Sequence, residues 1–247
     1  MSEAQATVRT PLGTVIGVDR GEVHVFRGIR YAEPPVGPLR FRPPAPVGPW
    51  SGALDATRFA PIAPQGSSRL NLVMGDFAAE QDEDCLSLNI WKPAAAEGPL
   101  PVLFWIHGGA FASGAGSLDW YSGEAFARRH GVIVVTINYR LGALGWLRIP
   151  GRSAGNMGLQ DQIEALRWVR EIIEAFGGDP EAITLFGQSA GGWSIAYLMT
   201  IQACRGLFSR AILQSAPLGI APPSAAEAEV TAGEFMAVLG LDASQTD

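Results

Sequence analysis

Apolar and polar residues alternate over short stretches at the start of the chain. The runs TVRT (7–10), GTVIGV (13–18) and EVHVFRG (22–28) are rich in β-branched residues, and glycine-containing turns separate them. This pattern predicts three short strands that form a small antiparallel meander.

From residue 86 onward, apolar runs of strand length alternate with stretches of helical spacing. Over 156–176 the apolar residues recur at intervals that predict a long helix with one apolar face. Uninterrupted Val- and Ile-rich runs are typical of strands buried on both faces of a parallel sheet. The predicted strands are 86–91, 101–107, 132–139, 183–187 and 211–215, and the shorter predicted helices are 122–130, a run after Ser189 to about Thr200, and an Ala/Glu-rich stretch near the C-terminus. This alternation predicts an α/β fold with a mostly parallel central sheet that is entered through the antiparallel meander.

Composition and charge restrict the class of protein. Hydrophobic residues make up 47% of the 247 and charged residues 17%, which is typical of a chain with a large folded core. The net charge is −6 and no run of Lys or Arg stands out, so we expect neither nucleic acid nor a membrane as a partner.

The N-terminus shows no secretory signal and no apolar run is long enough to span a membrane. Two cysteines, Cys85 and Cys204, fit a reducing compartment, so we expect a cytoplasmic protein with free thiols.

A G-x-S-x-G pattern is centred on Ser189, between a predicted buried strand and a predicted helix. This is the context of a nucleophile elbow, in which a strained turn presents the serine hydroxyl and the next backbone N–H can bind an oxyanion. Gly187 and Gly191 fit such a turn because side chains there would clash with neighbouring elements. The pattern alone also fits a plain Gly/Ser turn without chemistry.

A second motif favours the chemical interpretation. WIHGGAF (105–111) directly follows another predicted buried strand. In hydrolases, a glycine-rich loop at this place supplies further backbone N–H groups to the oxyanion hole. The two motifs together indicate a serine nucleophile with its oxyanion-stabilising loop.

The chain resembles the N-terminal half of the type-B carboxylesterases, which include the para-nitrobenzyl esterases and the cholinesterases. The blocks that carry the resemblance are FRGIRYAEPPVGPLRFRPPAPVGPW (26–50), EDCLSLNIW (83–91), WIHGGAF (105–111), VTINYRLGALGWL (135–147), GNMGLQDQIEALRWVREIIEAFGGDP (155–180), TLFGQSAGG (184–192) and GLFSRAILQSA (206–216). The resemblance implies an α/β-hydrolase fold and a serine carboxylic-ester hydrolase that forms an acyl-enzyme from a small-molecule ester, without metal or organic cofactor.

The resemblance also implies roles for individual residues. Ser189 matches the nucleophile, and Gly109, Ala110 and Ala190 match the three oxyanion N–H donors. Gly108 lets the loop turn, and Ser215 supports the catalytic acid.

Further matches concern structure. Arg40 with Glu83, and Arg140 with Asp161, match ion pairs that we expect to be nearly buried. Cys85 matches a position at which secreted relatives form a disulfide, but the partner position, near Ala63, is not cysteine here, so we expect Cys85 to be a free thiol.

No residue of the chain is an obvious base for Ser189. The three histidines are His24, His107 and His130, and all precede Ser189, whereas in this fold the order is Ser, then Asp or Glu, then His. We expect His24 to pack in the meander, His107 to order the oxyanion loop and His130 to end a surface helix. The acidic residues after Ser189 lie in the C-terminal helical stretch, namely Glu227, Glu229, Glu234, Asp242 and Asp247.

The resemblance therefore places the acid and the histidine beyond residue 247. We expect residues 1–247 to be the N-terminal portion of a single α/β-hydrolase catalytic domain whose C-terminal portion is absent from this chain. A complementary C-terminal half would supply Glu or Asp and His, and the chain alone would be inactive. The alternatives are a catalytically incomplete fragment or a non-catalytic, adhesion-type binding member of the same fold.

Overall fold

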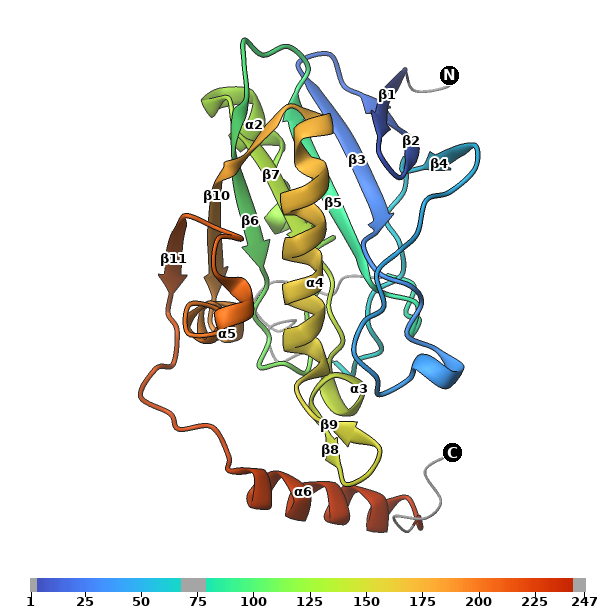
Figure 1. The fold of residues 1–247 in the computed structure, drawn as a ribbon, viewed down its shortest axis with the longest axis vertical. Coiled ribbons are helices and arrows are strands. Elements are labelled where there is room, and N and C mark those ends of the chain that lie inside the picture. The colour runs from blue at the N-terminus through green and yellow to red at the C-terminus, as the bar shows by residue number, and fades with distance from the viewer. Residues whose placement is uncertain (1–3, 68–78, 242–247) are drawn as a thin grey trace.

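The structure, a computed structural model, describes residues 4–67 and 79–241. One nine-stranded mixed sheet runs through this part of the chain in the order β1-β2-β3-β5-β7-β6-β10-β11, with β4 paired to β2 (Figure 1). The strands are β1 (Gln5–Thr10), β2 (Gly13–Asp19), β3 (Val23–Arg30), β4 (Ala53–Asp55), β5 (Ser87–Pro93), β6 (Leu100–Ile106), β7 (Ile133–Ile137), β10 (Gly178–Gln188) and β11 (Arg210–Gln214).

The sheet changes character at β7. From β1 to β7 each neighbour along this order is antiparallel, which confirms the entry meander and adds β5 to it. β7, β6, β10 and β11 are parallel. The mostly parallel central sheet predicted from the apolar runs is confirmed, and all five residues of β7 are buried.

Helices cover both faces of the sheet. α2 (Glu124–His130) packs with Ala127 against Val134 and Trp91, whereas the core on the opposite face holds Val135 together with the long helix α4 (Met157–Ile172). Neighbouring residues of one strand thus point to opposite faces, as strand geometry requires. α5 (Ala190–Leu198) packs near β10 and β11 beside α4 (Figure 1).

The sequence pattern did not predict the short elements near the C-terminal end of the sheet. These are α3 (Gly142–Trp146) and the two-stranded hairpin β8 (Arg148–Ile149) and β9 (Ser153–Ala154). Short 3-10 helices add Gly37–Leu39, Asp119–Tyr121, Ile173–Phe176 and Gln202–Cys204.

The predicted Ala/Glu-rich helix is α6 (Ala225–Val238). Its N-terminus is closed by a capping box, in which Ser224 and Glu227 bond each other's backbone N–H. An extended segment carries the chain from β11 to α6, which lies across the end of the molecule against β8 and β9 (Figure 1). Arg148 and Glu229 tie the helix to the hairpin with a 3.0 Å ion pair.

Candidate active site

Ser189 occupies a strained turn between β10 and α5. Its backbone angles are φ 53° and ψ −118°, which a residue with a side chain rarely adopts. Such a conformation costs about 1–3 kcal/mol and persists only where the surroundings enforce it. Two hydrogen bonds do so: Ser189 N donates to Gln214 O of β11 at 2.8 Å, and Trp193 N donates to Ser189 O at 2.9 Å.

The glycines on either side of Ser189 are sterically required. A Cβ at Gly191 would lie 2.0 Å from the carbonyl oxygen of Ile106, the last residue of β6. A Cβ at Gly187 would lie 2.8 Å from the same oxygen. The explanation for the glycines of the G-x-S-x-G pattern is confirmed, because β6 passes so close to the turn that no side chain fits.

The loop after β6 runs directly beside this turn. A Cβ at Gly108 would be 2.6 Å from the carbonyl oxygen of Gln188 and 3.2 Å from the Cβ of Ser189. Gly109 has φ 114°, and Ala110 and Phe111 follow with φ 55° and 59°, so three successive residues bend the loop through the left-handed region. The fold thus brings the two sequence motifs together.

The remaining predicted site residues flank the turn. Ala190 is the first residue of α5, and no side chain caps this helix terminus. A free helix N-terminus favours negative charge through its unpaired N–H groups and its dipole. Ser215 follows β11 directly after Gln214, the residue that bonds Ser189 N, and has φ 50° with an exposed side chain.

The histidines occupy three separate environments. His24 lies in β3 with Nε2 3.6 Å from Asp19, and His130 is the last residue of α2. His107 is 1% exposed, and its Nδ1 lies 2.8 Å from the carbonyl oxygen of Gly108. Burial lowers the pKa of His107 to about 4, so its ring is neutral near neutral pH. Within 4–67 and 79–241, no hydrogen bond connects a histidine to the Ser189 hydroxyl.

Of the acidic residues after Ser189, Glu234 lies on α6, and two others on that helix are engaged elsewhere. Glu227 caps α6 and Glu229 bonds Arg148. Asp242 and Asp247 lie outside the described residues.

The two expected ion pairs form, but they differ in burial. Asp161 bonds Arg140 through both carboxylate oxygens, at 2.6 and 2.8 Å, and the two side chains are 0% and 3% exposed. Burial raises the pKa of Asp161, and the hydrogen bonds from Arg140 oppose that rise. Arg40 and Glu83 also pair at 2.6 Å, yet 47% of the Arg40 side chain is exposed, so the expectation that this pair is nearly buried is wrong.

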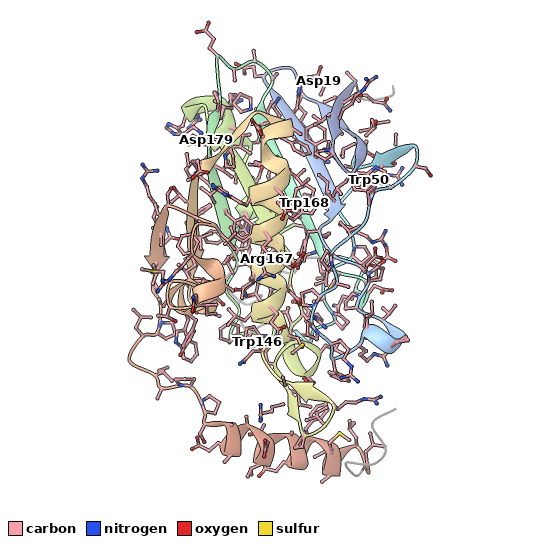
Figure 2. The ribbon with its side chains drawn as sticks, viewed as in Figure 1. Asp19, Trp50, Trp146, Arg167, Trp168 and Asp179 are labelled. Carbon is pink, nitrogen blue, oxygen red and sulfur yellow. The ribbon has the colours of Figure 1, made fainter. Side chains whose placement is uncertain are left out.

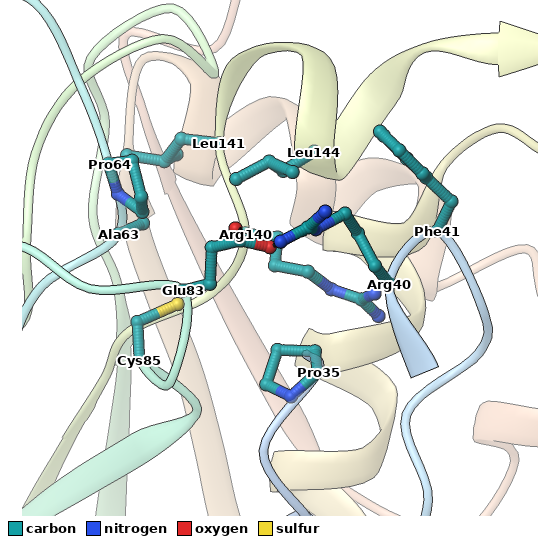
Figure 3. Close-up of a pocket in the computed structure, with 10 residues that line it drawn as sticks. All are labelled: Pro35, Arg40, Phe41, Ala63, Pro64, Glu83, Cys85, Arg140, Leu141 and Leu144. Atoms are coloured by element: carbon teal, nitrogen blue, oxygen red, sulfur yellow. Dashed lines mark hydrogen bonds and ion pairs between the residues drawn. The ribbon is translucent and has the colours of Figure 1, made fainter. Parts of the chain in front are cut away.

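The cysteines are free and buried, as expected. Cys85 lines a small cavity together with Ala63, Glu83 and Arg140 (Figure 3). A larger cavity of about 730 Å³ opens between the segment 37–42, α3 and α6, and Ser189 lines neither of the two. Figure 2 shows side chains around α4, with Trp168 partway along the helix and Trp146, of α3, near its lower end.

The described residues hold neither a candidate metal-binding cluster nor a candidate membrane-spanning helix. The described residues contain no cluster of three His, Cys, Asp or Glu side chains arranged to hold a metal ion. Nor does any helix in this part of the chain have both the length and the apolarity to cross a membrane.

Comparison with known proteins agrees with this geometry. The model of the carboxylesterase family matches residues 4–245. The para-nitrobenzyl esterase of Bacillus subtilis (strain 168) is 45% identical over 97% of this chain and 49% of its own length. A probable N-octanoylanthranilate hydrolase of Rhodococcus erythropolis is 48% identical over 96% of this chain and 52% of its own length. Among solved structures, a thermophilic PNB esterase superposes with a TM-score of 0.92 at 45% identity, over 99% of this chain and 50% of that one.

The chain therefore belongs to the carboxylesterase family, and its sheet and helices are those of the α/β-hydrolase fold. It spans about half the length of the relatives that it matches.

Sequence reasoning did not find two residues that shape the loop after β6. Tyr139 stacks on the His107 ring at a centroid distance of 4.3 Å and donates a hydrogen bond to the His107 carbonyl oxygen at 2.8 Å. Gln65 bonds both the N–H and the carbonyl oxygen of Gly114 through its side-chain amide. Both lie far from the loop in sequence, and only the tertiary fold brings them to it.

Proposed function

We propose that the protein containing this chain hydrolyses small-molecule carboxylic esters with Ser189 as the nucleophile. The observation that carries the proposal is the backbone of Ser189, which is held in a strained conformation beside the loop at Gly108. Ser189 attacks the ester carbonyl, and an acyl-enzyme forms and is then released by water.

The oxyanion of the tetrahedral intermediate is stabilised by the backbone N–H groups of Gly109, Ala110 and Ala190. The left-handed bend of the loop and the uncapped start of α5 support this assignment, because both leave N–H groups without helical partners. Removing one such donor typically costs about 10²–10³ in kcat. No metal or organic cofactor is needed for these steps.

The acid and the histidine come from a complementary C-terminal half of the same catalytic domain, which lies outside residues 1–247. The support is that no described histidine reaches Ser189, and that the neighbourhood of Ser215 is open. Three apolar side chains near this edge are about half exposed or more: Ile212 at 49%, Leu218 at 59% and Ile220 at 61%. Ser215 helps to hold the incoming acid. Apolar surface of this kind marks a contact with further polypeptide.

One relative is named a para-nitrobenzyl esterase and another a probable N-octanoylanthranilate hydrolase, whose name denotes an amide, so the names do not agree on one substrate. For this protein we propose the reaction class and no particular ester.

The test compares residues 1–247 alone with the same chain supplemented by a C-terminal polypeptide that completes the domain. The substrate is para-nitrophenyl butyrate, and each preparation is paired with its Ser189→Ala variant. We expect Ser189-dependent turnover only in the supplemented protein, with a loss of about 10⁴–10⁶ in kcat on Ser189→Ala, because triad residues act as a unit.

Two results contradict the proposal. Ser189 would not be the nucleophile if the Ser189→Ala variant of the supplemented protein kept more than about a tenth of the activity. That would be far above the residual activity expected after loss of a triad residue. If residues 1–247 alone showed Ser189-dependent turnover at ordinary esterase rates, the base would lie within this chain.

A further inference from the structure

We propose that His107 is a positioning residue. Its neutral imidazole, protonated at Nδ1, donates a hydrogen bond to the Gly108 carbonyl oxygen and thereby directs the Gly109 N–H toward the oxyanion. The inference rests on the proposed function, since it assigns a task to a residue of the same site.

The hydrogen bond fixes the position of the ring proton. His107 Nδ1 lies 2.8 Å from the Gly108 carbonyl oxygen, and a carbonyl oxygen can only accept a hydrogen bond. The proton therefore resides on Nδ1. The other nitrogen, Nε2, is buried and has no hydrogen-bond partner among the described residues, which suits a nitrogen that carries no proton.

The same hydrogen bond orients a peptide plane. In a trans peptide the C=O of one residue and the N–H of the next point in opposite directions within one plane. Since His107 holds the Gly108 carbonyl on its own side, the Gly109 N–H must point to the other side of the loop. Ser189 flanks the loop at Gly108, where a Cβ would lie 3.2 Å from the serine Cβ.

The surroundings allow the ring only this placement. Tyr139 stacks on it with an interplanar angle of 18° and bonds the His107 carbonyl oxygen. A Cβ at Gly114 would lie 2.5 Å from Nδ1 and 2.6 Å from the Gly108 oxygen, so only glycine leaves room for the hydrogen bond. Gln65 holds Gly114 in place by accepting from its N–H at 2.7 Å and donating to its carbonyl oxygen at 3.0 Å.

This arrangement also excludes His107 as the base for Ser189. Nδ1 donates to the Gly108 carbonyl oxygen, and Nε2 is buried with no partner in the described part of the chain. Burial lowers the pKa of the ring to about 4, which keeps it neutral over the working range of an esterase and leaves the Nδ1 hydrogen bond unchanged.

Two variants separate positioning from packing. His107→Asn places an amide N–H near the former Nδ1 and can still donate to Gly108, whereas His107→Phe keeps a stacked ring without a donor. In the Ser189-active, supplemented protein we expect His107→Phe to lower kcat by about 10- to 100-fold with little change in KM, which is less than complete loss of one oxyanion donor. His107→Asn should retain most of the kcat.

A measurement without turnover accompanies the kinetics. In ¹⁵N-labelled protein, the imidazole nitrogen shifts of His107 should show a proton on Nδ1 and a bare Nε2 at pH 7, in residues 1–247 alone as well as in the supplemented protein. A proton on Nε2, or equal kcat losses in the Asn and Phe variants, or unchanged kcat in both, would overturn the proposal. Ser189→Ala in the same preparation distinguishes the two failures: if it stays active, the proposed nucleophile is wrong, while the tautomer of His107 is still decided by the spectrum.

Discussion

The turn at Ser189 and the edge at β11 belong to one sheet, but the chain encloses them to very different degrees. Around the turn, Leu185, Gly187 and Gly191 are buried, and the carbonyl of Ile106 leaves no room for a side chain at either glycine. β11 alternates between exposed and half-buried residues, and half of Ile212 is open. The side of the site that carries Ser189, the proposed nucleophile, is built within this chain, and the side facing the proposed base is open.

The same contrast separates the interior helix α4 from α6. α4 buries most of its residues, including the charged Asp161, whereas α6 buries only Ala232 and Met236 and leaves Val238 86% exposed. Open apolar surface on β11 and α6 is expected if further polypeptide completes the domain.

The largest expected effect compares the ion pairs of the two regions. Asp161→Asn would leave Arg140 as an uncompensated buried charge and should lower the free energy of unfolding by about 3–5 kcal/mol. Glu229→Gln, which breaks the exposed pair of α6 with Arg148, should cost less than about 1 kcal/mol. Urea unfolding of both variants measures the difference, and equal losses would show that the interior is no better enclosed than the edge.

The next effect is a pH dependence confined to the interior. The pKa of His107 is about 4 in the folded chain and near 6.5 when unfolded, so the unfolded state binds more protons between these values. The stability that this residue contributes is complete above pH 6.5 and is lost as the pH falls toward 4, by about 3 kcal/mol.

His107→Asn should remove this slope, because asparagine does not titrate. The measurement is the free energy of unfolding at pH 7 and pH 4.5, compared between the parent chain and the variant. His24, whose pKa burial also lowers, is present in both and cancels in the difference. The same slope in both chains would place the titration elsewhere.

Gly191→Ala and Gly219→Ala test the two regions with one identical substitution. A Cβ at Gly191 would lie 2.0 Å from the Ile106 oxygen, while a Cβ at Gly219, in the segment after β11, would meet no atom of the described residues within 4 Å. We expect Gly191→Ala to lower the free energy of unfolding by about 1–3 kcal/mol through overpacking, and the melting temperature with it. Gly219→Ala should change it by less than about 0.5 kcal/mol, as surface substitutions do. Equal melting temperatures would mean that the turn relaxes without strain.

Sequence patterns predicted the regular elements well because burial on both faces of β6, β7 and β10 leaves long apolar runs. The two glycine-containing motifs located the turn and the loop, because a close approach of two backbone segments admits only glycine. The patterns did not show that α4 is buried around much of its circumference, because Asp161 and Gln162 are polar residues on buried positions.

Other features depend on contacts between distant parts of the chain. Three of these contacts join residues at least 30 positions apart. They are the exposed ion pair of Arg40 with Glu83, the stacking of Tyr139 on His107 and the hydrogen bonds of Gln65 to Gly114. The short hairpin β8–β9 has strands of two residues, too short for any periodicity to register.

The smallest expected effect concerns the open edge. Ile212→Lys replaces an apolar side chain that is 49% exposed at the last strand of the described sheet. In residues 1–247 alone the change should alter the free energy of unfolding by less than about 0.5 kcal/mol, because little apolar contact is lost. If the complementary half covers β11, the same charge would be buried without a partner when the two polypeptides associate, and the apparent affinity should fall.

Titrating the C-terminal polypeptide against both chains, with the regain of para-nitrophenyl butyrate hydrolysis as the signal, measures that affinity. Ala96→Lys, at an exposed position in the loop between β5 and β6, is the control for added charge away from β11. An unchanged affinity for Ile212→Lys would place the contact away from β11, and a large loss of stability in the isolated chain would show that the edge is already enclosed.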